Sequence, residues 1–218
     1  ALESVRKEVD ESKQALFYAA FLLCLAGLLG IVVTGDMFNV FVFLEISSLS
    51  AYALIALGKD RRALRASYQY LIMGSVGATF IVIGIGMLYV MTGSLNMANL
   101  AILLPELPSN RTIPVAFAFL TVGVCLKLAL FPLHMWLPNA YTFAPSAVTA
   151  FIASTATKVA IYVLLRLFYT VFGSDYSFLE MQLGTYLLPL SLIAIFSMSL
   201  VAIFQANVKR MLAYSSLA

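Results

Sequence analysis

Apolar runs close to 20 residues long alternate with short polar connections along most of the chain. A helix rises about 1.5 Å per residue, so runs of this length cross a hydrocarbon core about 30 Å thick. Strand-like alternation of polar and apolar positions is absent, which leaves helices as the structure that satisfies the backbone in lipid. The pattern therefore predicts an all-α, polytopic transmembrane helix bundle. The expected spans cover about 15–33, 36–57, 67–91, 112–131, 146–170 and 185–206, followed by a truncated span from 208.

The two ends of the chain differ from this apolar body. Residues 1–14 carry acidic and basic side chains at helical spacing, which is typical of a solvated helix, so we predict a polar helical lead-in there. This stretch lacks the features of a signal peptide. The last residues stop within a predicted helix, and both ends look interrupted. We expect the chain to be an internal piece of a longer protein.

The stretch 132–145 is mostly apolar and yet contains three prolines. Proline removes a backbone donor and ends or kinks a helix. In a membrane, irregular backbone of this kind is tolerated where it is buried in protein or lines a cavity. We therefore expect a broken helix or a buried connection here rather than an aqueous loop.

Composition agrees with a lipid environment, because 62% of the 218 residues are hydrophobic and only 11% are charged. The formal net charge of +3 is small and forms no basic stripe, so nucleic acid is not expected as a partner. Cys24 and Cys125 lie inside apolar runs, which argues against a disulfide framework or a metal cluster. The basic segments 59–65 and 209–210 are an even number of crossings apart, and the positive-inside rule places both on the cytoplasmic side.

Three ionisable residues interrupt the apolar runs: Glu45, Lys127 and Lys158. An intramembrane charge costs at least about 2.5–3.5 kcal/mol, so each of them needs a partner or a water-filled cavity. Glu45 and Lys158 lie near the middle of their predicted spans. Lys127 lies nearer the end of its span, where a long basic side chain can reach the interface.

An amine whose counter-charge can approach or retreat is a switchable proton site, because the nearby charge decides which form is stable. We predict that Glu45 and Lys127 form such a pair, and that Lys158 passes the proton onward through water and His134. His134 suits a relay because the ordinary pKa of histidine is about 6.5, although an interfacial hydrogen-bonding role fits it equally. The structural alternative is a static ion pair that fixes helix register while no proton moves.

Other residues receive structural interpretations. Asp36 is expected to begin the second span, where a negative charge suits the helix dipole. Arg166 is expected to reach the membrane interface from the end of the fifth span. The glycines of the third span are expected to permit close helix packing: Gly74, Gly77, Gly84 and Gly86.

Four segments carry motifs that resemble one known family. They are Gly-Asp-Met-Phe-Asn-Val-Phe-Val-Phe-Leu-Glu at 35–45, Thr-Gly-Ser-Leu-Asn-Met at 92–97, Leu-Lys-Leu-Ala-Leu-Phe-Pro-Leu-His-Met-Trp-Leu-Pro at 126–138, and Val-Lys-Arg-Met-Leu-Ala-Tyr-Ser-Ser at 208–216. The order and content of these motifs resemble the proton-translocating antiporter-like subunits. That family includes the large membrane subunits of respiratory complex I, the Mrp-type cation/proton antiporter subunits and the membrane subunits of energy-converting hydrogenases. The resemblance covers nearly the whole chain from about residue 20.

The resemblance implies that residues 15–218 form an antiporter-like transmembrane domain within a fourteen-helix subunit. The six spans then correspond to the fourth through ninth helices of that subunit. Glu45 matches the family's glutamate on the fifth helix, Lys127 the lysine on the broken seventh and Lys158 the lysine on the eighth. The ionisable residue that the family carries on its twelfth helix is missing from this sequence.

As to function, the resemblance implies a proton-translocating subunit of a multisubunit complex in a bacterial or archaeal plasma (inner) membrane, with other membrane subunits, protons and possibly sodium as partners. The phrase at 93–100 is similar to the D-type Mrp subunit, which favours monovalent cation (sodium)/proton antiport. The alternative is an antiporter-like subunit of NADH:quinone oxidoreductase or of a membrane-bound hydrogenase, although Asn139 and Tyr141 stand where the complex I pattern usually has aspartate and histidine. A third reading is a structural membrane scaffold with inert ion pairs.

If the complex carries out a redox reaction, we expect that reaction to occur on other subunits. We expect no cofactor, no metal ion and no redox reaction on this chain, because its polar residues form no phosphate loop, catalytic triad or metal-ligand motif. Whether the chain belongs to an oxidoreductase therefore depends on other subunits, and the sequence leaves that question open.

Overall fold

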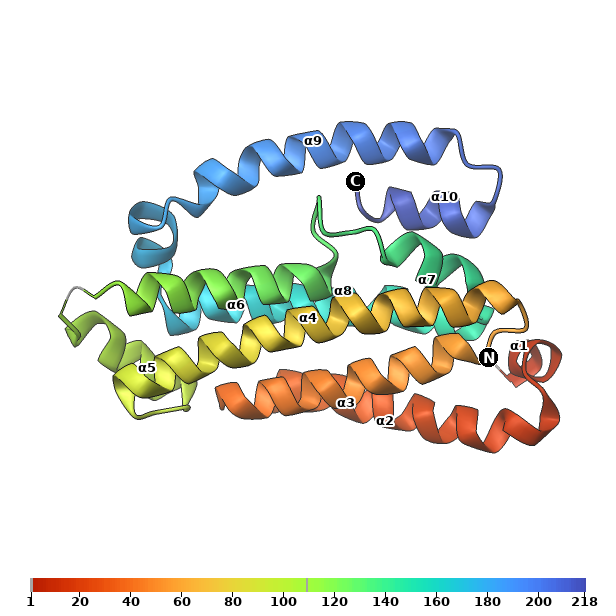
Figure 1. The fold of residues 1–218 in the computed structure, drawn as a ribbon, viewed down its shortest axis with the longest axis horizontal. Coiled ribbons are helices and arrows are strands. Elements are labelled where there is room, and N and C mark those ends of the chain that lie inside the picture. Colours follow the sequence, from red (N-terminus) through yellow and green to blue (C-terminus); the bar gives the residue numbers. More distant parts are fainter. Residues whose placement is uncertain (1, 109) are drawn as a thin grey trace.

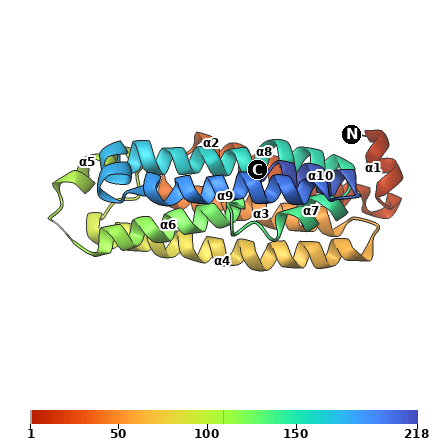
Figure 2. The same cartoon turned by 90° about the horizontal axis from the view of Figure 1, so that it is seen from above.

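The computed structural model describes residues 2–108 and 110–218, and this part of the chain is helical apart from turns and short connections. Figures 1 and 2 show long helices that run along a common axis. The α-helices are α1 (Leu2–Glu8), α2 (Gln14–Val33), α3 (Met37–Ala56), α4 (Arg61–Thr92), α5 (Met97–Leu103), α6 (Thr112–Leu128), α7 (Leu137–Phe143), α8 (Ser146–Leu165), α9 (Leu183–Ile203) and α10 (Val208–Ser215). Shorter 3-10 segments cover Glu11–Lys13 and Leu104–Glu106, and π-helical segments cover Arg166–Val171 and Tyr176–Glu180.

Five helical stretches are long and apolar enough to cross a membrane. They are Glu11–Val33, Met37–Ala56, Arg61–Thr92, Ser146–Val171 and Leu183–Ile203. Helix α6 is also apolar but has only 17 residues, because an irregular segment of backbone follows Leu128. The protein is an integral membrane protein built as an all-α bundle.

Two helix boundaries differ from the sequence prediction. Helix α4 begins at Arg61 rather than near residue 67, because the Asp60 side chain accepts a hydrogen bond from the Arg62 backbone N–H and caps the helix. The basic residues expected in a loop therefore lie in the first turns of α4. Between the third and fourth predicted spans, where only a loop was expected, Asn96 caps the short helix α5.

Helix α4 packs closely against α6, and glycines permit that approach. A Cβ atom at Gly77 would lie 3.0 Å from the carbonyl oxygen of Gly123, and one at Gly84 would lie 2.7 Å from Leu120 Cγ. Gly74 faces α3 instead, where a Cβ would clash with the hydroxyl of Tyr52. The packing prediction is therefore confirmed at three of the four glycines and is wrong for Gly86, which has nothing within 4 Å of a Cβ position.

Two of the sequence motifs meet at one end of the bundle. The backbone N–H of Met37 donates to the carbonyl of Leu95 (2.8 Å), and that of Met97 donates to the carbonyl of Gly35 (2.9 Å). The Asp36 carboxylate accepts a hydrogen bond from the Asn39 N–H and caps α3, which confirms the structural interpretation of Asp36. The first turns of α3 and α5 are thus fixed to each other.

Arg166 lies at this same end of the bundle and has a definite partner. Its guanidinium donates to the carbonyl of Thr34, which follows the last residue of α2. A cation there suits the negative end of the helix dipole. Arg166 therefore ties the end of α8 to the end of α2, and its position at the membrane interface stays a prediction.

The opposite end of the bundle gathers the basic segments (Figure 1). The Lys59 ammonium donates to the carbonyl of Lys7 (2.6 Å), and the Lys209 ammonium donates to the carbonyl of Ala144 (3.2 Å). The two basic segments that the positive-inside rule placed together therefore do lie at one end. The acidic connection before α9, which holds Asp175 and Glu180, lies at the other end.

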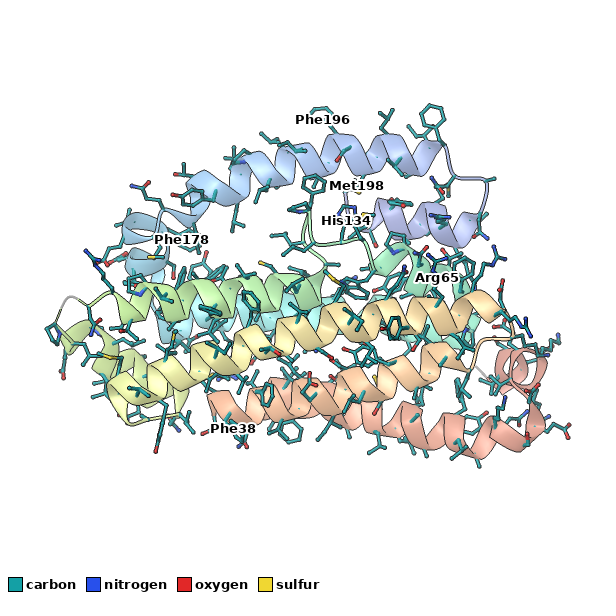
Figure 3. All side chains as sticks on the ribbon, in the orientation of Figure 1. Phe38, Arg65, His134, Phe178, Phe196 and Met198 are labelled. Atoms are coloured by element: carbon teal, nitrogen blue, oxygen red, sulfur yellow. The ribbon has the colours of Figure 1, made fainter. Side chains whose placement is uncertain are left out.

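Helix α9 stands apart from the rest of the bundle along most of its length (Figure 1). Figure 3 shows Phe196 pointing away from the molecule and Met198 pointing inward. These side chains are 75% and 6% exposed, respectively. Since α9 is apolar on all sides, its outer face is suited to lipid or to another membrane helix.

The start of α8 is capped by a residue far away in the sequence. Pro145, at the N-cap position of α8, provides no capping side chain, and the Glu8 carboxylate of α1 accepts the Ser146 N–H instead. Partial burial opposes ionisation of Glu8, but the hydrogen bonds from Ser146 and the charge of Lys209 outweigh it, so the pKa of the Glu8 carboxyl lies below its ordinary value of 4.5.

Replacing Glu8 by glutamine is expected to destabilise the protein by about 1 kcal/mol at neutral pH, as for the loss of a helix cap. Because the folded-state pKa of Glu8 is lowered, its contribution is fully present above pH 4.5 and is lost as the pH falls through that lowered value. The measurement is thermal unfolding of the full-length protein in detergent, at neutral pH and at a pH below the lowered pKa of Glu8. Glu3→Gln is the control, since Glu3 is an exposed acidic residue of the same helix that pairs with the exposed Lys7. Equal effects of the two substitutions at neutral pH would contradict the cap.

Candidate functional site

The predicted break after α6 is present, and it ends that helix inside the protein. Ala129 takes a left-handed backbone conformation (φ 62°), and its N–H still bonds back to the last turn of α6. Pro132 has no N–H to continue a helix, and helical structure resumes only at Leu137. The expected broken helix is therefore confirmed. The irregular part of it is only partly buried, because His134 is buried whereas Met135 is 72% exposed, and most of the residues from Trp136 to Tyr141 are buried again.

The buried Trp136 holds this break in place. Its indole N–H donates to the carbonyl of Leu126 in the last turn of α6 (3.1 Å), a carbonyl that also accepts the backbone N–H of Ala129 (3.3 Å). Its ring stacks on Tyr70 of α4, with centroids 3.9 Å apart, and Tyr70 packs edge-on against Tyr52 of α3. The last turn of α6, which carries Lys127, is thereby fixed relative to α3 and α4.

Lys127 and Glu45 form the ion pair that the sequence predicted. The Lys127 ammonium donates to Glu45 Oε1 (3.1 Å) and to the hydroxyl of Ser48 (2.8 Å). The Lys127 side chain is only 4% exposed, whereas that of Glu45 is 28% exposed. The expectation that Lys127 could reach the interface is wrong, because the end of α6 lies within the bundle rather than at the membrane surface.

The surroundings of the pair are mostly apolar. A small cavity of about 20 Å³ adjoins Lys127, and on the side of α8 its wall consists of Ala156, Val159 and Ala160. Polar groups near the pair come from the other helices, among them the hydroxyl of Tyr52, which is buried and has no hydrogen-bond partner within residues 2–108 and 110–218. In such surroundings a charge is stabilised chiefly by its direct partners.

Lys158 and His134 lie elsewhere. Lys158 is exposed on α8, and its ammonium donates to the carbonyl of Ala153 (2.8 Å) and to the hydroxyl of Thr157 (3.3 Å). His134 is buried in the break, stacks on Phe131 with ring centroids 5.4 Å apart, and has an Nδ1 atom without a hydrogen-bond partner in the described part of the chain. Neither side chain bonds to the ion pair there, so the structure brings together only two of the four predicted residues.

Sequence reasoning missed Ser48, Trp136 and Tyr70 as parts of this site. Ser48 follows Glu45 by three positions on α3, which places both on one face of the helix, and that spacing was the available signal. Trp136 stands in the quoted motif at 126–138, but its hydrogen bond depends on how the chain turns after Ala129. No sequence pattern indicated the stacking of Tyr70 on Trp136, because these residues are far apart in the chain.

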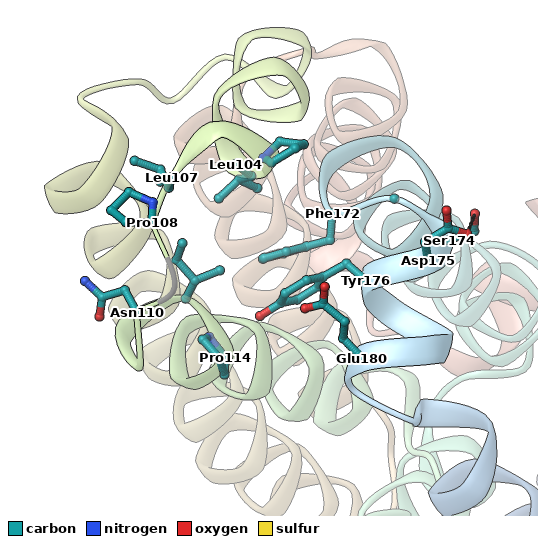
Figure 4. Close-up of a pocket in the computed structure, with 13 residues that line it drawn as sticks. Leu104, Leu107, Pro108, Asn110, Pro114, Phe172, Ser174, Asp175, Tyr176 and Glu180 are labelled. Atoms are coloured by element: carbon teal, nitrogen blue, oxygen red, sulfur yellow. Dashed lines mark hydrogen bonds between the residues drawn. The ribbon is translucent and has the colours of Figure 1, made fainter.

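A second cavity, of about 650 Å³, lies at the end of the bundle away from the basic segments (Figure 4). It opens between residues 104–108 and 110–114 on one side and the π-helical turns before α9 on the other, and Asp175, Tyr176 and Glu180 contribute to its wall. Burial and the nearby Glu180 carboxylate raise the pKa of Tyr176 to about 12, so this phenol stays protonated. None of the predicted site residues lines this cavity.

Residues 34–218 match the family model described as "NADH:quinone oxidoreductase/Mrp antiporter, TM". The chain is 50% identical over 208 residues to the N subunit of the NADH-quinone oxidoreductase of Desulforudis audaxviator, covering 94% of this chain and 40% of that protein. It is 35% identical over 205 residues to the D subunit of the Na(+)/H(+) antiporter of Alkalihalophilus pseudofirmus, covering 94% of this chain and 41% of that protein. The chain thus spans about two fifths of the length of these curated relatives.

Solved structures match over the same part of the chain. A chain of the membrane-bound sulfane sulfur reductase, an archaeal respiratory membrane complex, superposes with a TM-score of 0.83 at 38% identity, covering 91% of this chain and 40% of that one. A chain of the Mrp complex from Dietzia sp. DQ12-45-1b gives a TM-score of 0.78 at 29% identity, covering 91% and 36%. Both matched chains are parts of membrane complexes with several subunits.

Proposed function

This chain belongs to the transmembrane family shared by NADH:quinone oxidoreductases and Mrp antiporters, and from that membership we propose that it is the proton-translocating part of a subunit in a multisubunit membrane complex. We place that complex in the plasma membrane of a bacterium or archaeon, where other membrane subunits are its partners. Protons are the transported ion in this proposal, and sodium is the exchanged ion if the complex is an antiporter.

The observation that carries the proposal is the contact between Lys127 and Glu45 at the break in α6. The charged form of a buried lysine is stable only beside a counter-charge. Movement of the Glu45 carboxylate therefore changes whether the Lys127 amine keeps its proton. Glu45 is the more exposed partner, which makes it the side from which a proton reaches the pair. The break leaves Lys127 on the last turn of a helix, beside backbone that can rearrange.

Beyond the pair, we propose that the proton continues to Lys158 and His134. Lys158 is on α8, whose small side chains Ala156, Val159 and Ala160 line the cavity next to Lys127. His134 has one unpartnered ring nitrogen and lies between the end of α6 and the start of α7. Neither side chain bonds directly to the pair in the described residues, so this route requires water or side-chain movement.

Two forms of the complex fit the family. An Mrp-type antiporter, in which proton movement drives sodium exchange, is supported by the similarity to the D subunit of a Na(+)/H(+) antiporter. A redox-driven membrane arm, in which the reaction occurs on other chains, is supported by the 50% identity to the N subunit of an NADH-quinone oxidoreductase. The two forms differ in one measurable respect, because only the first requires sodium. The third reading, an inert scaffold, requires only that the ion pair hold the helices together.

Glu45→Gln and Lys127→Ala are each expected to reduce proton transport to about a hundredth of the parent rate, because each removes one half of a proton-transfer pair. The measurement is proton transport by the full-length assembly in sealed vesicles, with and without sodium. Glu106→Gln, at an exposed acidic position, is the matched control and should transport like the parent. A parent that needs sodium favours antiport, and parent-like transport in both pair variants would leave only the scaffold reading.

A further inference from the structure

We propose that Ser48 is a positioning residue of this site: a second, neutral acceptor that keeps the Lys127 ammonium in place when Glu45 releases it. The proposal rests on the proposed proton transport through Lys127. It adds a residue that was not among the predicted ones, and it explains how the buried Lys127 ammonium keeps its position while the Glu45 carboxylate moves.

The hydrogen bonds of the serines on α3 distinguish Ser48 from its neighbours. Ser47 donates its hydroxyl proton to the carbonyl of Leu44, and Ser50 donates to the carbonyl of Ile46, as serines in helices commonly do. In the described part of the chain, the Ser48 hydroxyl makes no such bond to a carbonyl of its own helix and instead accepts a hydrogen bond from the Lys127 ammonium. The bond is 2.8 Å long, shorter than the 3.1 Å bond from Lys127 to Glu45.

The two acceptors differ in the freedom they have to move. Ser48 is 5% exposed and has a short side chain, so its oxygen stays close to the backbone of α3. Glu45 has a longer, partly exposed side chain that can turn away without disturbing the helix. When the Glu45 carboxylate takes up a proton or rotates, Ser48 leaves the ammonium with one acceptor in the same position.

Few other groups can take over that task. The nearest is the hydroxyl of Tyr52, one turn beyond Ser48 on α3, which is buried near the pair and makes no hydrogen bond within the described residues. From α4 the ring of Tyr70 lines the cavity beside Lys127, from α2 the thiol of Cys24 does so, and from α8 the wall is apolar. Cys24 donates its thiol proton to the carbonyl of Ser47. Within residues 2–108 and 110–218, the charged group facing Lys127 is Glu45, and the side-chain oxygens that accept a hydrogen bond from the ammonium belong to Glu45 and Ser48.

The test is the pH profile of proton transport by the full-length assembly in vesicles. In Ser48→Ala the ammonium loses an acceptor and gives up its proton more readily, so the alkaline limb of the profile should move toward acid by about one pH unit. Ser48→Thr keeps the hydroxyl and should restore the parent profile. Ser50→Ala is the matched control, because its hydroxyl bonds only within α3.

Two outcomes would overturn the proposal: a profile of Ser48→Ala that superimposes on the parent, or a Ser48→Thr variant as shifted as Ser48→Ala. If Ser48→Ala does not assemble, Ser48→Cys serves the same purpose, since a thiol keeps an atom at the position of the hydroxyl and accepts hydrogen bonds only weakly. Lys127→Ala in the same vesicles distinguishes a failure of the proposed proton transport from a failure of the role of Ser48. Parent-like transport in Lys127→Ala rejects the proposed function, whereas an inactive Lys127→Ala with an unshifted Ser48→Ala rejects only the role of Ser48.

Discussion

Glu45→Gln is expected to destabilise the protein by about 3–5 kcal/mol, and adding Lys127→Met to the same chain is expected to recover most of that loss. The single substitution leaves a 4% exposed ammonium without a counter-charge, which is the costly way to break a buried pair. Replacing both residues by neutral ones removes that cost, because a flexible apolar side chain can fill the space of the lysine. The measurement is the free energy of unfolding of parent, single and double variants in detergent.

The same cycle distinguishes the two partners. Lys127→Met alone leaves a carboxylate that the protein encloses less completely than it encloses the ammonium (28% against 4% exposed), so its cost should be smaller than that of Glu45→Gln. Raising the pH should reduce the cost of Glu45→Gln, since a deprotonated amine needs no counter-charge. Additive losses in the double variant would show that the two side chains are not coupled. A double variant that is stable but inactive in transport would separate the proton role from a scaffold role.

The helices could be predicted from the sequence because lipid leaves the backbone few alternatives. Long apolar runs had to become spans, and three prolines in an apolar stretch had to interrupt one. What the hydrophobic pattern could not predict were ends that depend on single capping contacts. Asp60 extends α4 back to Arg61, and Asn96 creates α5 within what reads as a loop. Asp and Asn are good capping residues, but such a residue begins a helix only where its own backbone is extended and the following backbone is helical, which the sequence does not reveal.

The central pair of the site was predictable because charge in lipid is costly, which made Glu45 and Lys127 conspicuous. The degree to which each side chain is buried could not be predicted in the same way. The hydrophobic pattern places Lys127 near an interface because the end of an apolar run usually marks the end of a span, whereas α6 ends within the bundle. Neutral residues such as Ser48 and Trp136 carry no comparable energetic cost, so their part in the site appears only from contacts between helices.

Gly123→Ala is expected to destabilise the protein by about 1–3 kcal/mol, the usual cost of forcing an extra methyl group into a packed interior. A Cβ at Gly123 would lie 2.7 Å from the carbonyl oxygen of Gly77 and 2.7 Å from Ile81 Cγ1, so α4 and α6 would have to separate. Gly86→Ala is the matched control on α4, because nothing lies within 4 Å of its Cβ position. Unfolding in detergent measures both variants, and equal stability of the two would contradict the close contact.

Gly123 also lies one helical turn before Lys127, so the same methyl group should disturb the ion pair. Pushing α6 away from α4 moves the ammonium relative to Glu45 and Ser48, which belong to α3 and do not move with α6. Proton transfer needs its groups within hydrogen-bonding distance, and a misplacement of about 1 Å can cost a hundredfold in rate. Transport by Gly123→Ala in vesicles should therefore fall further than its stability at the assay temperature explains. A well-folded Gly123→Ala assembly with parent-like transport would show that the position of α6 does not govern the site.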